Sequence, residues 1–365
     1  MRTYRVGGAV RDALLGLQVN DHDWVVVGAT PQEMILAGYL PVGKDFPVFL
    51  HPETREEYAL ARTERKTARG YHGFVFHTDP DVTLEQDLAR RDLTINAIAE
   101  GEDGALIDPF HGQRDLQRKV LRHVTAAFRE DPVRILRVAR FAARFHDFAI
   151  APETLALMRD MVDEGEADAL VAERVWQELA RGLMQARPAR MLDVLQECGA
   201  LPRLLPEIAP LWRPPLRAVL DRAAGRDAPL PVRFACLAHE LAEPALRQLC
   251  ERLRVPNECR ELAQVLAREH GNLLQGGCAS AGEVLQLLER CDAIRKPQRF
   301  DGVLLACACI EPGFDGNRLA RALQAALAVR TAEVAAQAQK DGLQGPQIGE
   351  RVQQARVAAV AQVLD

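Results

Sequence analysis

The residue pattern of the chain changes near Asp131, and this change restricts the folds that the chain can adopt. Of its 19 aromatic residues, 14 lie before residue 150, and the apolar runs at 46–50 and 58–61 alternate as β-strands do. Beyond Asp131, Ala, Leu and Arg recur at helical spacing, as in residues 318–327, and prolines separate the helices. The sequence therefore predicts an α+β head followed by an all-helical remainder.

Composition indicates a folded protein of several domains. The 365 residues are 48% hydrophobic and 27% charged, which excludes a disordered, collagenous or membrane-spanning chain. At about 100–200 residues per domain, two or three domains are expected. No apolar run reaches the roughly 18 residues of a membrane helix, and the chain begins without an apolar leader, so we expect a cytoplasmic protein with no membrane partner.

Arginine and cysteine are used unevenly along the chain. Arg outnumbers Lys by 41 to 5 within a net charge of −5. Arg suits forked contacts with phosphates and base edges, although codon usage alone would also explain the bias. All eight Cys follow residue 197 and none forms a Cys-x-x-Cys pair. We therefore expect buried, reduced thiols rather than zinc ligands or disulfides.

A glycine pair near the start of the chain suggests a phosphate-binding turn. Residues 3–6 read as a strand, Gly7-Gly8 as a turn, and residues 9–15 as a short helix. Such a turn leaves backbone amides free and close enough to hold a phosphate. Arg11, in the first turn of that helix, would add positive charge to the same site. A glycine pair alone is weak evidence, because most such pairs are simply turns.

Two carboxylates follow the glycine turn and make its interpretation as part of a phosphate site more specific. Asp21 and Asp23 directly precede the apolar strand at residues 24–27. Residues i and i+2 of a strand share one face, so the two carboxylates converge. Two aspartates together with substrate phosphates are a usual way to hold Mg²⁺, whereas a solvated pair is the plainer alternative. Combined with the glycine turn, the pair predicts phosphoryl or nucleotidyl transfer, with Asp21 and Asp23 as catalytic metal ligands.

A helix rich in arginine is predicted to start after residue 130. Asp131 is expected to cap this helix and Pro132 to occupy its first position. Four arginines then step along the helix by three, three and four residues, which places them within an arc of about 120° on one face. A solvated surface is the alternative reading of such a face. The four residues are Arg134, Arg137, Arg140 and Arg144.

Asp131 and Arg134 together could distinguish bases without a nucleic acid template. Cytosine and adenine both present an amino donor beside an unprotonated ring nitrogen, which a carboxylate and a guanidinium can bind. Uracil and guanine present the reverse order. They would leave both side chains facing like groups, at about 1–3 kcal/mol for each unmet bond. The pair therefore predicts acceptance of C and A and rejection of U and G.

These motifs, taken in order, resemble those of the bacterial class II CCA-adding tRNA nucleotidyltransferases and the related bacterial poly(A) polymerases. The resemblance spans roughly the first 210 residues. The sequence around these motifs is most similar to that of the proteobacterial CCA-adding enzymes. The matching segments are residues 7–12, 21–23, 90–92, 108–116, 130–134, 137–141 and, more loosely, 173–178.

The resemblance implies a fold and a set of roles. The fold is α+β, with an N-terminal polymerase-β-like nucleotidyltransferase head (a mixed sheet with helices) and an all-α neck, body and tail. Asp21 and Asp23 would bind Mg²⁺, and Glu57 is a candidate third carboxylate whose alternative is a surface charge. The residues implied to contact CTP or ATP are Gly8, Arg11, Arg91, Asp131, Arg134, Arg137 and Arg140.

The resemblance also implies what the parts of the chain do. Residues 1–120 would form the catalytic head, 121–215 the nucleotide-selecting and RNA-binding neck and body, and 216–365 a helical platform for tRNA. Longer relatives carry a His-Asp phosphohydrolase module. Here His239 is followed by Glu240 and the expected His-rich stretch is missing, so we expect neither phosphatase nor phosphodiesterase activity.

The activity implied is addition and repair of the 3′-terminal CCA of tRNA from CTP and ATP. The expected partner is tRNA, through its 3′ end and acceptor arm, and not DNA. Three alternatives remain open at this point: a poly(A) polymerase, an enzyme that adds only CC or only A, and a catalytically silent RNA-binding protein. The lack of a long basic C-terminal extension argues against the first.

Overall fold

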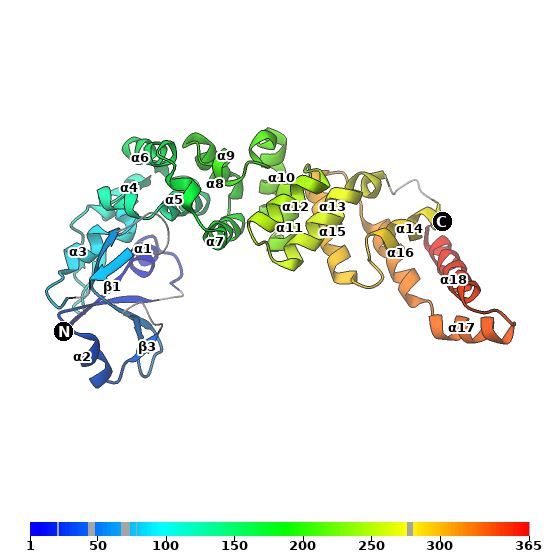
Figure 1. The fold of residues 1–365 in the computed structure, drawn as a ribbon, viewed down its shortest axis with the longest axis horizontal. Helices are drawn as coiled ribbons and strands as arrows, with labels where there is room; N and C mark the ends of the chain where they lie inside the picture. Colours follow the sequence, from blue (N-terminus) through cyan, green and yellow to red (C-terminus); the bar gives the residue numbers. More distant parts are fainter. Residues whose placement is uncertain (20–21, 43–47, 67–73, 78, 276–279, 365) are drawn as a thin grey trace. The chain divides into compact units, whose positions relative to one another are not determined.

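The structure is a computed structural model that describes residues 1–19, 22–42, 48–66, 74–77, 79–275 and 280–364. The chain forms two compact units, Met1–Pro206 and Glu207–Asp365, which we describe separately. Figure 1 shows strands and helices in the first unit and helices alone in the second. This pattern confirms the expected α+β class. The expected division into three parts, at residues 120 and 215, stays a prediction.

The head is built on a mixed sheet of seven strands in the order β3-β4-β5-β2-β1-β8-β9. Strands β2 and β5 run parallel and the other neighbours run antiparallel. A separate hairpin joins β6 to β7. The strands of the sheet are β1 (Arg2–Val6), β2 (Asp23–Val27), β3 (Leu40–Val42), β4 (Val48–Leu50), β5 (Glu57–Leu60), β8 (Ala99–Glu100) and β9 (Leu106–Ile107), and those of the hairpin are β6 (Thr63–Lys66) and β7 (Phe74–His77).

The first two strands form because their apolar residues pack on the head core. Val6 and Val25 are buried in one cluster, and Val26 is buried in a second cluster on the other side of the sheet. The chain leaves β1 through Gly7, whose φ of +69° favours glycine, and enters α1 (Gly8–Leu14) at once. The predicted strand–turn–helix is therefore present.

Strand register places two acidic residues side by side at the end of the sheet. Asp23 of β2 is the register partner of Glu57 of β5. The next pair along, Trp24 and Tyr58, stacks with ring centroids 5.3 Å apart. Because side chains alternate between the two faces of a sheet, Asp23 and Glu57 share the face opposite these rings.

The head also carries short helices and a small parallel strand pair. Thr30 and Thr83 cap two of the helices, since each hydroxyl accepts from a backbone N–H and the matching Glu33 or Gln86 bonds back. The elements are α2 (Pro31–Leu36), α3 (Leu84–Ala89), η1 (Thr94–Asn96), α4 (Gly112–Arg118), β10 (Val120–Leu121), η2 (Ala126–Glu130) and β11 (Ala149–Ile150).

The helical part of the first unit packs around α5 (Val133–Arg144). Its apolar face is fully buried, with Ile135, Val138 and Ala142 at 0% exposure, and rests against α7 (Ala172–Leu183) and α8 (Pro188–Glu197). Gly182 allows the last two helices to approach, because a Cβ there would lie 2.0 Å from the Met191 sulfur. The remaining helices of this unit are α6 (Pro152–Asp163), η3 (Glu166–Ala169) and α9 (Leu201–Leu204).

The start of α5 differs slightly from the prediction. The sequence places Pro132 in the first helical position and Asp131 at the cap, whereas the helix begins at Val133 with Pro132 as its cap residue. Asp131 still accepts a hydrogen bond from the Val133 backbone N–H at 3.1 Å. The carboxylate therefore satisfies one amide of the first turn from a position one residue farther out than expected.

The second unit consists of helices whose apolar faces meet in its centre. Seven of the eight cysteines are buried free thiols here or at the end of the first unit, and Cys278 lies outside the described residues. This confirms the expectation for those seven thiols. The helices are η4 (Ala209–Leu211), α10 (Pro214–Gly225), α11 (Leu230–Ala238), α12 (Glu243–Arg252), α13 (Asn257–Gln275), α14 (Ala281–Arg290), α15 (Pro297–Ile310), α16 (Asn317–Ala328), α17 (Thr331–Lys340) and α18 (Pro346–Leu364).

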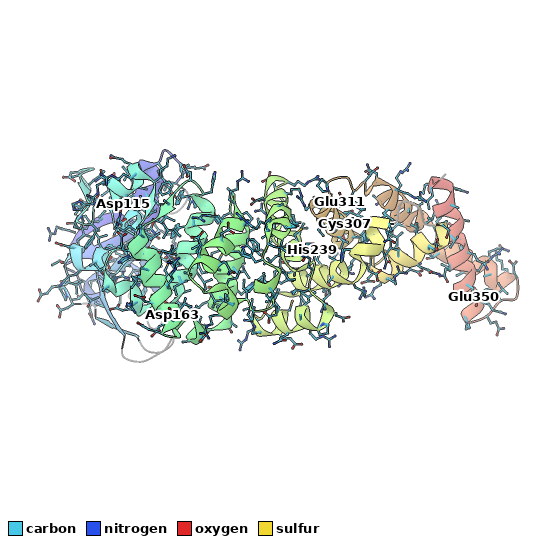
Figure 2. The ribbon with its side chains drawn as sticks, turned by 90° about the horizontal axis from the view of Figure 1, so that it is seen from above. Asp115, Asp163, His239, Cys307, Glu311 and Glu350 are labelled. Carbon is cyan, nitrogen blue, oxygen red and sulfur yellow. The ribbon has the colours of Figure 1, made fainter. Side chains whose placement is uncertain are left out.

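His239 ends α11 as a packed helix residue (Figure 2). Its Nδ1 lies 2.8 Å from the Cys236 carbonyl oxygen, its ring meets that of His270 edge-on, and burial lowers its pKa. Among the described residues, no three His, Cys, Asp or Glu side chains gather in a way that could hold a metal ion. None of the helices in the described ranges is both long and apolar enough to cross a membrane.

Candidate active site

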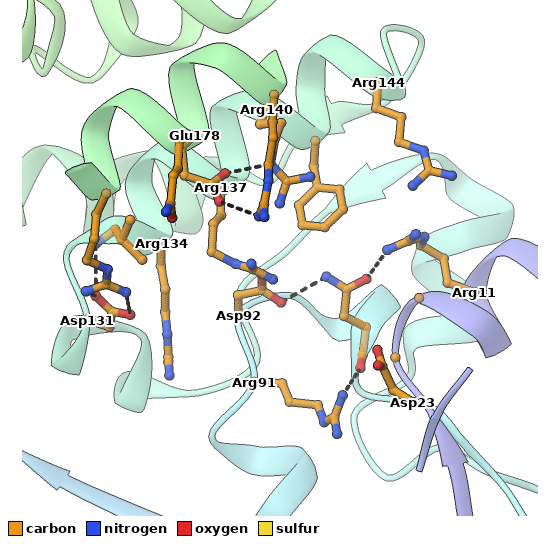
Figure 3. A pocket seen from close by; sticks show the side chains of 18 of the residues that line it. Arg11, Asp23, Arg91, Asp92, Asp131, Arg134, Arg137, Arg140, Arg144 and Glu178 are labelled. Atoms are coloured by element: carbon orange, nitrogen blue, oxygen red, sulfur yellow. Dashed lines mark hydrogen bonds and ion pairs between the residues drawn. The ribbon is translucent and has the colours of Figure 1, made fainter. Parts of the chain in front are cut away.

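A cavity of about 690 Å³ opens in the first unit between the head and the arginine face of α5 (Figure 3). All four α5 arginines predicted to share one face line it, so that face borders a cavity. Arginine dominates the lining among the described residues. The lining residues are Gly7, Gly8, Arg11, Asp23, Arg90, Arg91, Asp92, Asn96, Asp131, Val133, Arg134, Arg137, Arg140, Phe141, Arg144, Arg174, Gln177, Glu178 and Arg181.

One wall of the cavity, which we call the head wall, comes from the glycine turn and the end of β2. A Cβ on Gly7 would lie 2.9 Å from Arg91 Nη1 and 4.0 Å from Asp23 Oδ2. The turn, the guanidinium and the carboxylate therefore crowd one point. The absence of a side chain at Gly7 allows that approach.

The predicted metal ligands are only partly described. Asp21 lies outside the described residues. Asp23 lines the cavity and is exposed, and its register partner Glu57 is also exposed but does not line the cavity. Carboxylate oxygens on one face of a sheet are the ligand type that a divalent cation such as Mg²⁺ takes. The residues present thus fit such an ion, and the metal-binding roles stay predictions.

Asp87 of α3 binds the two head arginines Arg90 and Arg91 on the side away from the cavity. Arg90 Nη2 donates to Asp87 Oδ1 at 2.7 Å, and Arg91 Nη2 donates to Oδ2 at 3.2 Å. Burial would raise the pKa of Asp87, but the charges of the two arginines outweigh it and lower that pKa. The carboxylate is therefore kept ionised, and both arginines are fixed at the cavity edge.

Arg11 and Arg144 meet on a second head carboxylate, Asp12. Arg11 Nε donates to Asp12 Oδ1 at 2.9 Å, and Arg144 Nη2 donates to Oδ2 at 2.9 Å. Arg11 also donates to Asn96 Oδ1 at 2.5 Å, and its guanidinium lies 5.2 Å from the centre of the Phe141 ring. Burial lowers the pKa of Arg11, against the opposing effect of Asp12. Asp12 thus ties the end of α5 to the head.

Asp92 forms the second link between the head and α5. Its Oδ2 accepts from Arg137 Nε at 2.7 Å, while Oδ1 accepts from Asn96 Nδ2 at 2.9 Å and from the Leu93 backbone N–H. Burial would raise the pKa of Asp92, but Arg137 and Asn96 outweigh it and hold that pKa below its ordinary value. Asp92 in turn raises the pKa of Arg137.

The other wall, which we call the helical wall, is formed by α5 and α7. Asp131 and Arg134 both line the cavity, as expected of a base-reading pair, but each has its own anchor. Both oxygens of Asp131 are bound by Arg174 of α7, at 2.9 and 2.7 Å. Arg134 is buried and donates through Nη1 to the Ala127 carbonyl oxygen at 2.8 Å.

A second carboxylate of α7 supports the middle of the arginine face. Glu178 is 5% exposed, and its Oε2 accepts from Arg140 Nε at 2.6 Å. The Arg140 guanidinium lies 4.6 Å from the centre of the Phe141 ring. Arg181 reaches Glu178 only at 3.7 Å and its side chain is 64% exposed, so it stands at the rim of the cavity.

Sequence reasoning found the four α5 arginines, Arg11 and Arg91, but missed Arg174 and the carboxylates that bind these arginines. Asp92, Arg174 and Glu178 stand within the motifs that carry the resemblance, yet no role was assigned to them. Arg174 and Glu178 are four residues apart, the spacing that places two side chains on one helix face. That spacing was the available signal.

Comparison with known proteins finds one family over most of the chain. The family profile described as "Poly A polymerase head domain" matches residues 3–122, and "Probable RNA and SrmB- binding site of polymerase A" matches residues 147–211. The "Multifunctional CCA protein" of Acidovorax ebreus (strain TPSY) is 59% identical, covering 99% of this chain and 96% of its own. That of Variovorax paradoxus (strain S110) is 58% identical, covering 99% of both.

Solved structures give the same result for the fold. The Bacillus stearothermophilus CCA-adding enzyme in complex with CTP is 26% identical, with a TM-score of 0.73 over 99% of this chain and 89% of that chain. A CCA-adding enzyme with ATP is 22% identical, with a TM-score of 0.72 over 98% of this chain and 86% of that chain. At this identity it supports the fold alone. The alignment to the Acidovorax ebreus relative spans 407 positions, so that relative carries residues which this chain lacks.

Proposed function

The chain belongs to the family of CCA-adding tRNA nucleotidyltransferases, and from this premise we propose that its cavity adds C, C and A in sequence to the 3′ end of tRNA. CTP and ATP are the substrates, and pyrophosphate leaves at each step. The observation that carries the proposal is that one cavity has Arg11, Arg91 and the Gly7-Gly8 turn on its head wall and Asp131 and Arg134 on its helical wall.

The head wall is suited to the triphosphate. Arg11 and Arg91 present guanidinium groups beside the Gly7-Gly8 turn, and both are fixed by carboxylates behind them. Fixed positive groups favour charge that is spread over phosphate oxygens, and they need no reorganisation when the reaction occurs. Gly8 offers close access to its backbone. These contacts do not depend on the base.

The helical wall is suited to the base. The carboxylate of Asp131 can accept from the amino group of cytosine or adenine, while Arg134 can donate to the neighbouring ring nitrogen. Arg137 and Arg140 would support the base or the triphosphate from the next turns of α5. Selection would then need no nucleic acid template.

Enzymes of this family generally use a divalent metal, and we take it to be Mg²⁺. Asp21, Asp23 and Glu57 would hold it. When bound, the metal lowers the pKa of the attacking 3′-hydroxyl and neutralises charge on the α-phosphate. Asp23 lines the cavity, which supports this assignment.

The remaining parts of the chain are assigned to tRNA. The segment that matches the RNA-binding profile would bind the acceptor arm, and the helices of the second unit would form the platform behind it. The cytoplasm is the expected compartment for this work. We also retain the prediction that no phosphatase or phosphodiesterase activity accompanies the transfer, since His239 bonds its own helix.

The test uses the full chain, Mg²⁺ and a tRNA transcript that ends at the discriminator base. Each nucleotide is supplied singly, then CTP with ATP, and the products are sized on a sequencing gel. We expect two additions with CTP alone and three with both. A long ladder with ATP alone would indicate a poly(A) polymerase. Addition of only CC or only A would indicate an enzyme with part of the activity. No addition would indicate a catalytically silent RNA-binding protein.

A further inference from the structure

We infer that Arg174 is a specificity-determining positioning residue, which fixes Asp131 so that one acceptor site of its carboxylate faces the incoming base. This inference rests on the proposed function, because it concerns how the same cavity chooses among nucleotides. Arg174 lies in the first turn of α7, 43 residues away from Asp131 in the chain.

The hydrogen bonds to Asp131 fill all but one of its acceptor positions. A carboxylate offers about four lone-pair sites, two on each oxygen. Oδ1 accepts from the Val133 backbone N–H at 3.1 Å and from Arg174 Nη1 at 2.9 Å. Oδ2 accepts from Arg174 Nη2 at 2.7 Å, which leaves one of its two lone-pair sites for a further donor. A single donor, such as the amino group of cytosine or adenine, completes the set.

The forked contact also fixes the plane of the carboxylate. A guanidinium that donates two parallel bonds orients its partner, whereas an ammonium acts as a point charge and leaves the partner free to turn. The side chain of Asp131 is only 18% exposed, and that of Arg174 is 26% exposed, so water competes little with the fork. Arg174 is therefore suited to set the direction of the remaining acceptor site.

Glu178, one turn farther along α7, does the same for the arginine face. It binds Arg140 at 2.6 Å, so α7 supports both a carboxylate and a guanidinium that line the cavity (Figure 3). Side chains of α7 thus hold both Arg140 of α5 and Asp131, which lies two residues before α5.

This arrangement explains rejection as well as acceptance. Uracil and guanine present a carbonyl oxygen where cytosine and adenine present an amine. A carboxylate that could turn away from the base would tolerate that oxygen. A carboxylate held by two N–H groups of one guanidinium keeps its remaining acceptor site pointed at the base. Loss of the fork should therefore affect the choice among nucleotides more than the transfer itself.

The experiment compares the full-length wild-type chain with Arg174→Gln and Arg174→Lys. Single-turnover incorporation into the tRNA transcript is measured with CTP and with UTP, and the ratio of the two specificity constants is taken. Arg5→Gln is the matched control, because Arg5 pairs with Glu100 in the same unit but outside the cavity. Thermal melts show that each variant is folded.

We expect the ratio of CTP to UTP to fall by at least about tenfold in Arg174→Gln and to fall less in Arg174→Lys, because an unmet bond to a charged group costs enough for such a change. The control should keep the wild-type ratio. An unchanged ratio in Arg174→Gln, an equal loss with both nucleotides, or a lysine variant identical to the wild type would overturn the inference. Failure of the wild type to add C would instead overturn the proposed function.

Discussion

The two walls of the cavity hold their charged groups in different ways. On the head wall, Gly7 lets Arg91 and Asp23 approach a backbone turn, and the guanidinium groups are pinned by Asp12 and Asp87. On the helical wall no glycine turn positions the charged groups described here. There, side chains of α7 orient Asp131, just before α5, and Arg140 of α5.

This difference matches what each wall would recognise. Triphosphate is common to every nucleotide, so fixed charge near a turn is sufficient to bind it. The base edge differs between nucleotides by the order of one donor and one acceptor, so reading it requires a carboxylate of known orientation. The account therefore predicts that changes on the head wall affect all nucleotides alike, whereas changes on the helical wall alter the ratio between them.

The largest effect is expected at the head wall, from Asp23→Asn. Removing a metal-binding carboxylate should reduce incorporation of CTP and of ATP by about a thousandfold or more, because transition-state charge would lose its main support. The ratio between nucleotides should hardly change. Single-turnover assays at saturating Mg²⁺ measure both quantities. Asp81→Asn, an exposed carboxylate of the head outside the cavity, is the control. Full activity of Asp23→Asn would remove this residue from the metal site.

A smaller effect is expected from Gly7→Ala. Gly7 has φ +69° and ψ −127°, a backbone conformation that L-residues avoid, so a side chain there costs about 1–3 kcal/mol, and the added Cβ would press on Arg91 at 2.9 Å. Activity with CTP and ATP should fall together by roughly tenfold or more. Gly104→Ala also introduces a side chain at a positive φ (+77°) but meets no atom within 4 Å, so it should keep activity. If both variants retained activity equally, the contact with Arg91 would not matter.

The sequence predicted the arginine face of α5 well, because helical spacing alone determines it. It also predicted the strand–turn–helix at Gly7-Gly8. It could not predict that Arg144 reaches Asp12, since the two are 132 residues apart and only tertiary packing joins them. The same holds for Asp131 and Arg174, which are 43 residues apart and lie on different elements. Asp21 lies outside the described residues, so its place beside Asp23 stays a prediction.

The smallest effect is expected where the two walls are joined, from Asp92→Asn. Loss of the charge opposite Arg137 should lower the free energy of unfolding by about 2 kcal/mol at neutral pH, since the pair is partly buried. The pKa of Asp92 lies below its ordinary value, so its stabilisation is present above about pH 4 and is lost as the pH falls further. Melting curves of the two proteins should therefore converge on acidification. A constant difference down to low pH would contradict this origin.

The central claim is that the helical wall reads the base, and Arg134→Ala tests it most directly. The measurement is single-turnover incorporation into the tRNA transcript with each of the four nucleotides. The account predicts weaker use of CTP and ATP, together with a loss of roughly tenfold or more in discrimination against UTP and GTP. An Arg134→Ala enzyme with the wild-type preference among the four nucleotides would show that selection does not come from this wall.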